Sequence, residues 1–123
     1  MTDHAIRQGL RVLVAEDEAL VSMLIEDMLA DAGAVVVGPA ATLDEALSLA
    51  RTETVDIALL DVNLAGKAIF PVADVLRERG VPFIFASGYG EAGIIEDHRG
   101  APVLQKPFRE ADLNRALAAI VPA

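Results

Sequence analysis

The stretch that decides the fold is residues 56–63, which read Asp-Ile-Ala-Leu-Leu-Asp-Val-Asn. A continuous apolar run of this length predicts a strand that is buried on both faces of a parallel sheet. Such a strand brings the carboxylate of Asp61 to the carboxyl edge of the sheet, where ligands gather in open α/β folds. An aspartate after a strand often only starts a turn, so Asp61 alone is a weak candidate for chemistry.

Strands and helices are predicted to alternate along the chain. Apolar residues at helical spacing follow each strand, including the stripe Leu20, Leu24 and Met28, and the sequence Thr42 to Glu45 has the form of a helix capping box. Gly38-Pro39 is expected to end the second strand. This alternation predicts an α/β fold with right-handed crossovers and a parallel, doubly wound sheet. The five strands are predicted at 10–15, 34–37, 56–63, 82–86 and 102–104.

One region departs from the alternation. Only eighteen residues separate Ser87 from Lys106, and they must hold a loop, a helix, a turn and a strand. We therefore expect the fourth of five helices to be short or irregular, near Ile94 to His98.

Composition limits the kind of protein. The chain has 123 residues, no cysteine and a formal net charge of −9, which predicts one domain at 8–122 after a short tail at 1–7, without disulfides. Scattered basic residues argue against nucleic-acid binding. No signal peptide or membrane span is apparent, so a cytoplasmic protein is expected. His4 and His98 lack metal-ligand spacing and are expected to be exposed to solvent.

Polar side chains follow four of the predicted strands. Glu16 and Asp17 follow the first strand, Asp61 ends the third, Ser87 follows the fourth and Lys106 the fifth. Parallel strands end at one edge, so these groups are predicted to surround one crevice. Two unit charges at about 5 Å repel by about 3 kcal/mol at an effective dielectric constant of about 20. The carboxylates therefore need a cation, and oxygen ligands favour Mg²⁺.

The chain resembles a response regulator receiver domain. The resemblance runs from the first strand to the last helix and rests on four stretches. It implies a flavodoxin-like strand order of 2-1-3-4-5, Asp61 as phosphoacceptor, and Glu16, Asp17, Asp61 and the Asn63 carbonyl as Mg²⁺ ligands. It also implies that Ser87 and Lys106 grip the phosphoryl group and that Lys106-Pro107 is a cis peptide. The four stretches are Val-Leu-Val-Ala-Glu-Asp-Glu at 12–18, Leu-Leu-Asp-Val-Asn-Leu at 59–64, Ala-Ser at 86–87 and Lys-Pro-Phe at 106–108.

Residues 85–89, Phe-Ala-Ser-Gly-Tyr, are similar to a subgroup of single-domain receivers with Phe-Ala-Thr-Gly followed by Gly or Tyr. Two positions depart from the family pattern. Val103 stands where most receivers carry an aromatic switch residue, so the usual readout is not expected, and Tyr89 is a candidate reporter in its place. Ala65 replaces a common proline, which leaves the loop after Asp61 less constrained.

The expected function is that of a stand-alone response regulator, a signalling protein rather than an enzyme. A histidine kinase is the expected phosphoryl donor, and the signal is expected to leave by contact with a downstream protein or by transfer to a histidine phosphotransferase. A monomer or weak dimer is expected. Two alternatives stay open: a receiver-like binding module that takes no phosphate, and a nucleotide-binding protein that uses Gly88, Gly90 and Gly93. The second is weak because no acidic residue ends a strand about twenty residues later.

Overall fold

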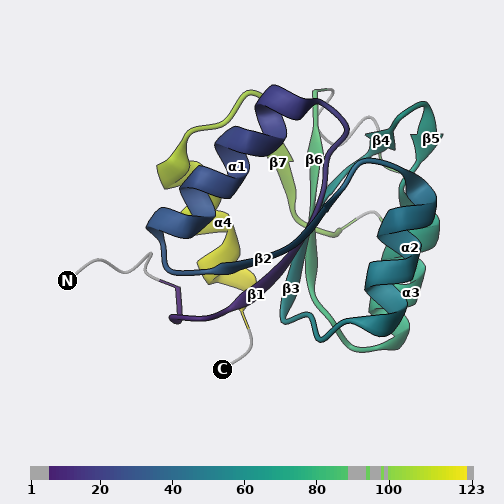
Figure 1. The fold of residues 1–123 in the computed structure, drawn as a ribbon, viewed down its shortest axis with the longest axis horizontal. Coiled ribbons are helices and arrows are strands. Elements are labelled where there is room, and N and C mark those ends of the chain that lie inside the picture. Colours follow the sequence, from purple (N-terminus) through teal and green to yellow (C-terminus); the bar gives the residue numbers. More distant parts are fainter. Residues whose placement is uncertain (1–5, 89–93, 95–97, 99, 122–123) are drawn as a thin grey trace.

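A five-stranded parallel sheet forms the centre of the molecule, with helices on both faces (Figure 1). The computed structural model describes residues 6–88, 94, 98 and 100–121. The sheet order is β2-β1-β3-β6-β7, which is the predicted order 2-1-3-4-5 when the five strands are counted along the chain. The flavodoxin-like fold is thus confirmed. The elements are β1 (Arg11–Ala15), α1 (Ala19–Asp31), β2 (Val35–Ala40), α2 (Leu43–Thr52), β3 (Ile57–Asp61), β4 (Asn63–Leu64), β5 (Lys67–Ala68), α3 (Phe70–Glu78), β6 (Phe83–Ser87), β7 (Val103–Gln105) and α4 (Glu110–Ile120).

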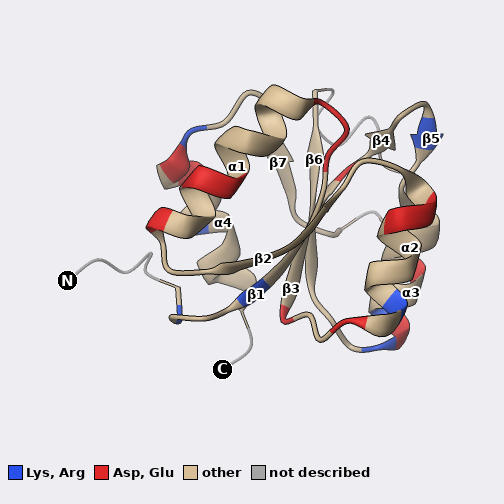
Figure 2. Cartoon of the chain, viewed as in Figure 1, with Lys and Arg blue, Asp and Glu red and all other residues tan. Residues whose placement is uncertain are grey.

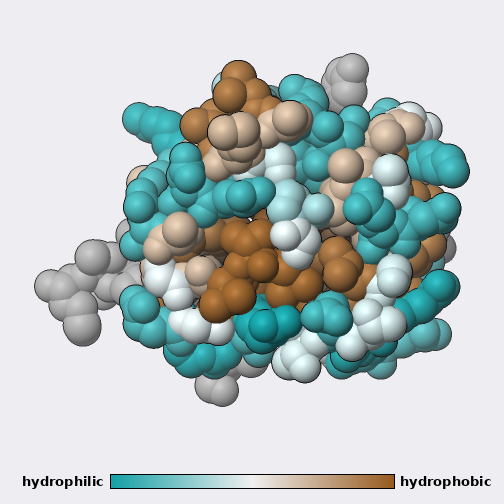
Figure 3. Space-filling view, in the orientation of Figure 1, coloured by the Kyte–Doolittle hydropathy of each residue, from teal (hydrophilic) through white to brown (hydrophobic). Residues whose placement is uncertain are grey.

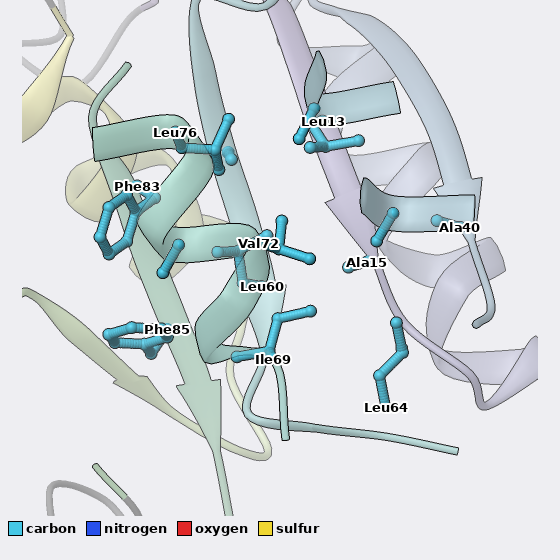
Figure 4. Close-up of a cluster of buried hydrophobic side chains, with 14 of the residues drawn as sticks. Leu13, Ala15, Ala40, Leu60, Leu64, Ile69, Val72, Leu76, Phe83 and Phe85 are labelled. Carbon is cyan, nitrogen blue, oxygen red and sulfur yellow. The ribbon is translucent and has the colours of Figure 1, made fainter. Parts of the chain in front are cut away.

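The sheet separates two hydrophobic clusters. Along β3, Ala58 and Leu60 belong to the cluster beneath α2 and α3, part of which is drawn in Figure 4, whereas Ile57 and Leu59 belong to the cluster beneath α1 and α4. This alternation follows from the two-residue period of a strand. All five residues of β3 are buried, as the opening stretch of the sequence predicts. Packing on both faces therefore fixes the position at which Asp61 leaves the sheet.

The predicted helix signals lie where the helices begin. Thr42 is the N-cap of α2, and its Oγ1 accepts a hydrogen bond of 3.2 Å from the Glu45 N–H. The Glu45 carboxylate returns a bond by accepting from the Ala41 N–H at 3.3 Å. Pro71 occupies the first turn of α3, where its missing N–H has no helical partner to lose. These local signals are confirmed.

The predicted end of the second strand is wrong. β2 continues through Gly38-Pro39 to Ala40, and its pairing with β1 shifts register between Leu13 and Ala15. Pro39 lies at this irregularity in the β1–β2 ladder, where the regular hydrogen-bonding pattern is interrupted and its missing N–H is tolerated. Gly38 has φ +99°, and a Cβ there would lie 2.8 Å from the Ala40 backbone nitrogen. Glycine thus permits the irregular passage through the edge strand.

The apolar stripe of α1 is divided between the core and the surface. Ile25 and Leu29 are buried against the sheet, whereas Leu20 is 71% exposed and Leu24 50% exposed. Met23, at 60% exposure, adds to the outer part of the stripe. Among the described residues, no helix is both long and apolar enough to cross a bilayer.

The described residues include four helices, and the short fourth helix that the sequence predicts near Ile94 to His98 lies mostly outside the described part of the chain. Ile94 and His98 themselves are described, and both are buried. The prediction that His98 is exposed to solvent is therefore wrong. The imidazole ring of His98 packs against three phenylalanines of α3 and β6. Spacing along the sequence does not reveal these contacts.

Candidate functional site

The predicted site residues lie at one edge of the sheet. Glu16 and Asp17 follow β1 directly, Asp61 is the last residue of β3, Ser87 ends β6, and Lys106 follows β7. Figure 2 shows the acidic loop between β1 and α1 in red beside the end of the sheet. Asp61 pairs in register with Ala86, the residue before Ser87, so these two polar groups end neighbouring strands. The structure thus brings together the groups that the sequence places at four strand ends.

Lys106 joins two of the carboxylates. Its Nζ lies 2.8 Å from Oε1 of Glu16 and 3.3 Å from Oδ2 of Asp61. The Lys106 backbone N–H also donates to the Ser87 carbonyl at 2.9 Å, which ties the residue to the end of β6. The peptide bond Lys106-Pro107 is cis, as the resemblance implies.

Glu16 is held by bonds to both of its carboxylate oxygens. Oε1 accepts from Lys106, and Oε2 accepts from the backbone N–H of Glu18 at 3.1 Å. Its side chain is only 1% exposed, so a buried charge is compensated on both sides. Glu16 therefore anchors Lys106 in the arrangement that the structure shows.

Burial raises the pKa of Asp61 to about 6, and the nearby negative charge of Glu16 acts in the same direction. The positive charge and hydrogen bond of Lys106 oppose this shift, as does the hydrogen bond from the Asn63 N–H, at 3.3 Å from Asp61 Oδ1. Burial and the charge of Glu16 outweigh these contacts. Asp61 is thus a carboxylate whose ionised form is destabilised, and further positive charge would stabilise it.

The pKa of Lys106 is raised as well, but for a lysine this shift favours the charged form. Burial disfavours its ammonium, but the hydrogen bond to Glu16 and the charges of Asp61 and Glu16 outweigh burial and raise the pKa of Lys106 above its ordinary value. The side chain therefore stays a cation beside Asp61 at physiological pH.

Three carboxylates are close enough to share a metal ion. Oxygen atoms of Glu16, Asp17 and Asp61 all lie within 4.8 Å of one another, and Asp17 is exposed whereas the other two are buried. Asn63 lines the same pocket. A donor set made only of oxygen fits Mg²⁺, which also keeps several waters that an exposed position can accommodate. The residues present therefore fit the predicted magnesium site.

The loop after Asp61 is a short hairpin. β4 and β5 pair antiparallel, and the connecting residues Ala65 and Gly66 have φ of 51° and 85°. Positive φ at both positions is what a two-residue type I′ turn requires. The Asn63 side-chain oxygen accepts from the Gly66 N–H at 2.9 Å. Pairing and this side-chain bond thus constrain the loop without the proline that Ala65 replaces.

A pocket of about 600 Å³ extends from Asp61 along α1. Sequence reasoning missed its apolar wall, although the unusually wide stripe of α1 was a signal for it. Figure 3 shows hydrophobic side chains at the surface over the N-terminal part of α1. The pocket thus joins a charged end to an apolar channel. Its lining residues from α1 and the turn after β7 are Val21, Leu24, Ile25, Met28, Pro107 and Phe108.

Some predicted features lie outside the described residues. Tyr89, the candidate reporter, and Gly90 and Gly93 of the nucleotide-binding alternative belong to the part of the chain that the structure does not describe. Gly88 is described and lines the pocket beside Asp61. Ser87 is described and is only 3% exposed at the end of β6.

Sequence comparisons agree with this geometry. A family model for the response regulator receiver domain matches residues 12–118. The transcriptional regulatory protein PdtaR of Mycobacterium tuberculosis is 32% identical over 111 residues, which cover 87% of this chain and 54% of PdtaR. The chain therefore spans about half the length of that relative.

Solved structures are similar over nearly the whole chain. SdrG from Sphingomonas melonis Fr1 has a TM-score of 0.81 and 38% identity, covering 93% of this chain and 98% of SdrG. The receiver domain of the sensor histidine kinase PA1611 from Pseudomonas aeruginosa PAO1 has a TM-score of 0.79 and 26% identity, covering 90% of this chain and 96% of that domain. The PA1611 structure has a magnesium ion coordinated in its active-site cleft.

Proposed function

Because the chain belongs to the response regulator receiver domain family, we propose that Asp61 accepts a phosphoryl group from a phosphohistidine of a histidine kinase in a Mg²⁺-dependent reaction. One observation carries the proposal. The carboxylate of Asp61 has a pKa raised to about 6, a lysine ammonium lies 3.3 Å away, and two further carboxylates lie within 4.8 Å. This combination supplies a nucleophile, a fixed cation and ligands for a second cation.

The chemistry is an in-line displacement at phosphorus. An oxygen of ionised Asp61 forms a bond to phosphorus while the bond from phosphorus to the donor imidazole nitrogen breaks, and that nitrogen keeps the electron pair. Lys106 is already positioned to neutralise charge on a phosphoryl oxygen. Ser87 ends the neighbouring strand, and in this proposal its hydroxyl donates to another phosphoryl oxygen. The product is an aspartyl phosphate.

Magnesium fits the charge balance of the site. Glu16, Asp17, Asp61 and the Asn63 carbonyl are the ligands that we propose, and the magnesium-bound PA1611 receiver domain supports this assignment by similarity. When bound, Mg²⁺ supplies positive charge that favours the ionised form of Asp61 and offsets charge on the phosphoryl group. Lys106 alone cannot compensate three carboxylates, which is why the site needs a second cation.

The apolar channel beside Asp61 supports a protein as the phosphoryl donor. A donor helix that carries histidine can lay an apolar face against α1, where Leu24 and Met28 line the pocket, and still reach Asp61. The same route serves onward transfer to a histidine phosphotransferase. A phosphotransfer profile against the histidine kinases of the source organism identifies the donor.

The experiment that tests the function is incubation of the protein with acetyl phosphate and Mg²⁺, followed by intact-protein mass spectrometry. We expect one phosphoryl adduct, and we expect it to be absent in Asp61→Asn. Asp44→Asn is the matched control, because Asp44 is an exposed aspartate on α2. An adduct that persists in Asp61→Asn would refute the proposal, as would a lack of any adduct in the wild-type protein.

A further inference from the structure

His98 is a buried histidine that the chemistry at Asp61 does not use. It is 1% exposed, and its ring stacks on Phe70 of α3 with centroids 5.5 Å apart and planes at 12°. Two more rings pack against His98 in edge-to-face geometry, with ring centroids 6.0 Å away for Phe83 and 5.8 Å away for Phe85. Figure 4 shows both of these phenylalanines on β6, facing α3. Polar groups in such an aromatic environment need specific partners.

Two charged side chains of α3 supply those partners. The Arg77 guanidinium lies 2.8 Å from Nδ1 of His98, and Oδ1 of Asp74 lies 2.8 Å from Nε2. A guanidinium can only donate, so Nδ1 must be an unprotonated acceptor. Nε2 then carries the single ring proton and donates it to Asp74. The contacts therefore fix His98 as the neutral Nε2–H tautomer in a directed chain from Arg77 to Asp74.

The aromatic site is connected to the phosphoacceptor edge through β6. Phe83, Phe85 and Ser87 are every second residue of that strand and so lie on one face of the sheet. Each is about 6 to 7 Å from the next. Asp61 pairs in register with the residue between Phe85 and Ser87. If the backbone at Ser87 moves toward a phosphoryl group, Phe85, two residues earlier on the same face, is the residue through which that movement reaches the aromatic site.

The position beside Phe85 on the neighbouring strand β7 carries no side chain that could report a movement of Phe85 by changing its hydrogen bonds. Val103 of β7 pairs in register with Phe85 and packs against the same hydrophobic cluster. Valine has no ring and no hydrogen-bonding group to change partners. Among the described residues of this cluster region, His98 is the side chain that combines a ring contact to Phe85 with hydrogen bonds to a surface helix.

We propose that the hydrogen bonds of His98 to Asp74 and Arg77 of α3 form a conformational clasp that opens when Asp61 is phosphorylated. With Lys106 bonded to Glu16 and Asp61, the clasp is closed by Asp74 and Arg77. Movement of Ser87 and Phe85 loosens the ring site, releases both hydrogen bonds and changes the surface that α3 presents. This inference rests on the proposed function, because phosphorylation is its input.

Nuclear magnetic resonance of the imidazole nitrogens tests the closed state directly. In ¹⁵N-labelled protein, long-range proton–nitrogen correlation distinguishes the two neutral tautomers from the protonated ring. We expect the Nε2–H tautomer for His98, with its signals assigned by comparison with a His4→Gln variant. A protonated ring or the Nδ1–H tautomer overturns the clasp, since neither can accept from Arg77 at Nδ1.

Beryllium fluoride, a mimic of the phosphoryl group, tests the opening. With Mg²⁺ and beryllium fluoride, the ¹⁹F signal of the bound anion reports occupancy at Asp61 in the same sample. We expect the His98 nitrogen signals to move toward those of a solvent-exposed histidine as occupancy rises. Bound fluoride with unchanged His98 signals overturns the inference and leaves the proposed function standing.

A matched pair of variants tests whether the clasp opposes activation. Asp74 and Glu78 are both exposed acidic residues of α3, but of the two only Asp74 bonds His98 in the described structure. Removing the acceptor by Asp74→Ala weakens the closed state, so we expect beryllium fluoride to bind about threefold or more tightly. Glu78→Ala should bind it as the wild type does. Equal affinity in Asp74→Ala and Glu78→Ala overturns the inference.

The two proposals fail in different ways. If neither bound fluoride nor an acetyl phosphate adduct is detected, the proposed function fails and the opening of the clasp fails with it. If an adduct forms at Asp61 but His98 and Asp74→Ala show no response, only the clasp fails.

Discussion

At the scale of single residues, the ionised form of Asp61 is destabilised in the folded protein. Burial and the charge of Glu16 raise its pKa to about 6, although Lys106 lies 3.3 Å away. The raised value means that the folded protein binds a proton here more readily than the unfolded chain does. Ionised Asp61 therefore destabilises the fold at neutral pH, and this penalty disappears as the pH falls from about 6 toward the ordinary value of 3.8.

Replacing Asp61 by asparagine should stabilise the protein at neutral pH. We expect Asp61→Asn to raise the free energy of unfolding at pH 7 by about 1–2 kcal/mol, because it removes a buried charge while Lys106 keeps its bond to Glu16. The gain should shrink as the pH falls below about 6. Urea unfolding at several pH values measures both effects.

The control for this prediction is Asp44→Asn on the exposed face of α2, which should change the free energy of unfolding by less than about 0.5 kcal/mol. A loss of stability in Asp61→Asn at neutral pH would show that the bond from Lys106 outweighs burial. Added Mg²⁺ should narrow the difference, because the metal favours the wild-type carboxylate.

At the scale of elements, the β4–β5 hairpin shapes the loop after Asp61, and Ala65 is the strained residue in it. Its φ of 51° is a left-handed conformation that alanine adopts at a cost. We expect Ala65→Asn to raise the free energy of unfolding by about 0.5–1 kcal/mol, since Asn-Gly is the favoured pair for this turn. Urea unfolding measures the change.

Proline at the same position should have the opposite effect. Ala65→Pro forces φ to about −65° and should lower the free energy of unfolding by more than about 1 kcal/mol. A neutral or stabilising result would mean that the loop is not a two-residue hairpin in solution.

The outer face of α1 is the other element with a direct test. Met23 is 60% exposed on the helix that lines the pocket. Met23→Glu should lower the rate of phosphotransfer from the cognate kinase about tenfold, because a new charge must be desolvated in an apolar contact. Phosphorylation by acetyl phosphate should stay within about twofold of wild type, because the small donor needs no helix contact.

Val35→Glu is the matched control for α1. Val35 is also an exposed hydrophobic residue, at 43%, but it lies on β2 and does not line the pocket. It should leave both phosphoryl donors unaffected. An equal loss of kinase transfer in the two variants would place the kinase contact elsewhere, or show a general effect of added negative charge.

At the scale of the whole molecule, the fold was predictable because its signals are local. Buried strands, helix spacing and the capping box at Thr42 each lie within a few residues, and five repetitions determine the sheet. The grouping of Glu16, Asp17, Asp61 and Lys106 at one edge followed from that sheet. The prediction needed only the rule that parallel strands end together.

The remaining features depend on contacts between distant parts of the chain. His98 is buried against phenylalanine rings and hydrogen-bonded to residues 21 and 24 positions away, contacts that no spacing rule detects. The exposure of Leu20 and Leu24 depends on how widely the sheet covers α1, and the passage of β2 through Pro39 depends on the register shift between β2 and β1. The two errors, at His98 and at the end of β2, thus arose where tertiary position overrides local preference.

The separation of the two hydrophobic clusters affects how two partner proteins could bind at the same time. α1 belongs to one face of the sheet and α3 to the other, with buried β3 between them. If a kinase docks along α1 to phosphorylate Asp61, as we propose, it contacts the face of the sheet opposite α3, and a downstream protein that binds α3 would contact the other face. Under these two proposals, Asp61 could be phosphorylated again while the downstream protein is still bound at α3.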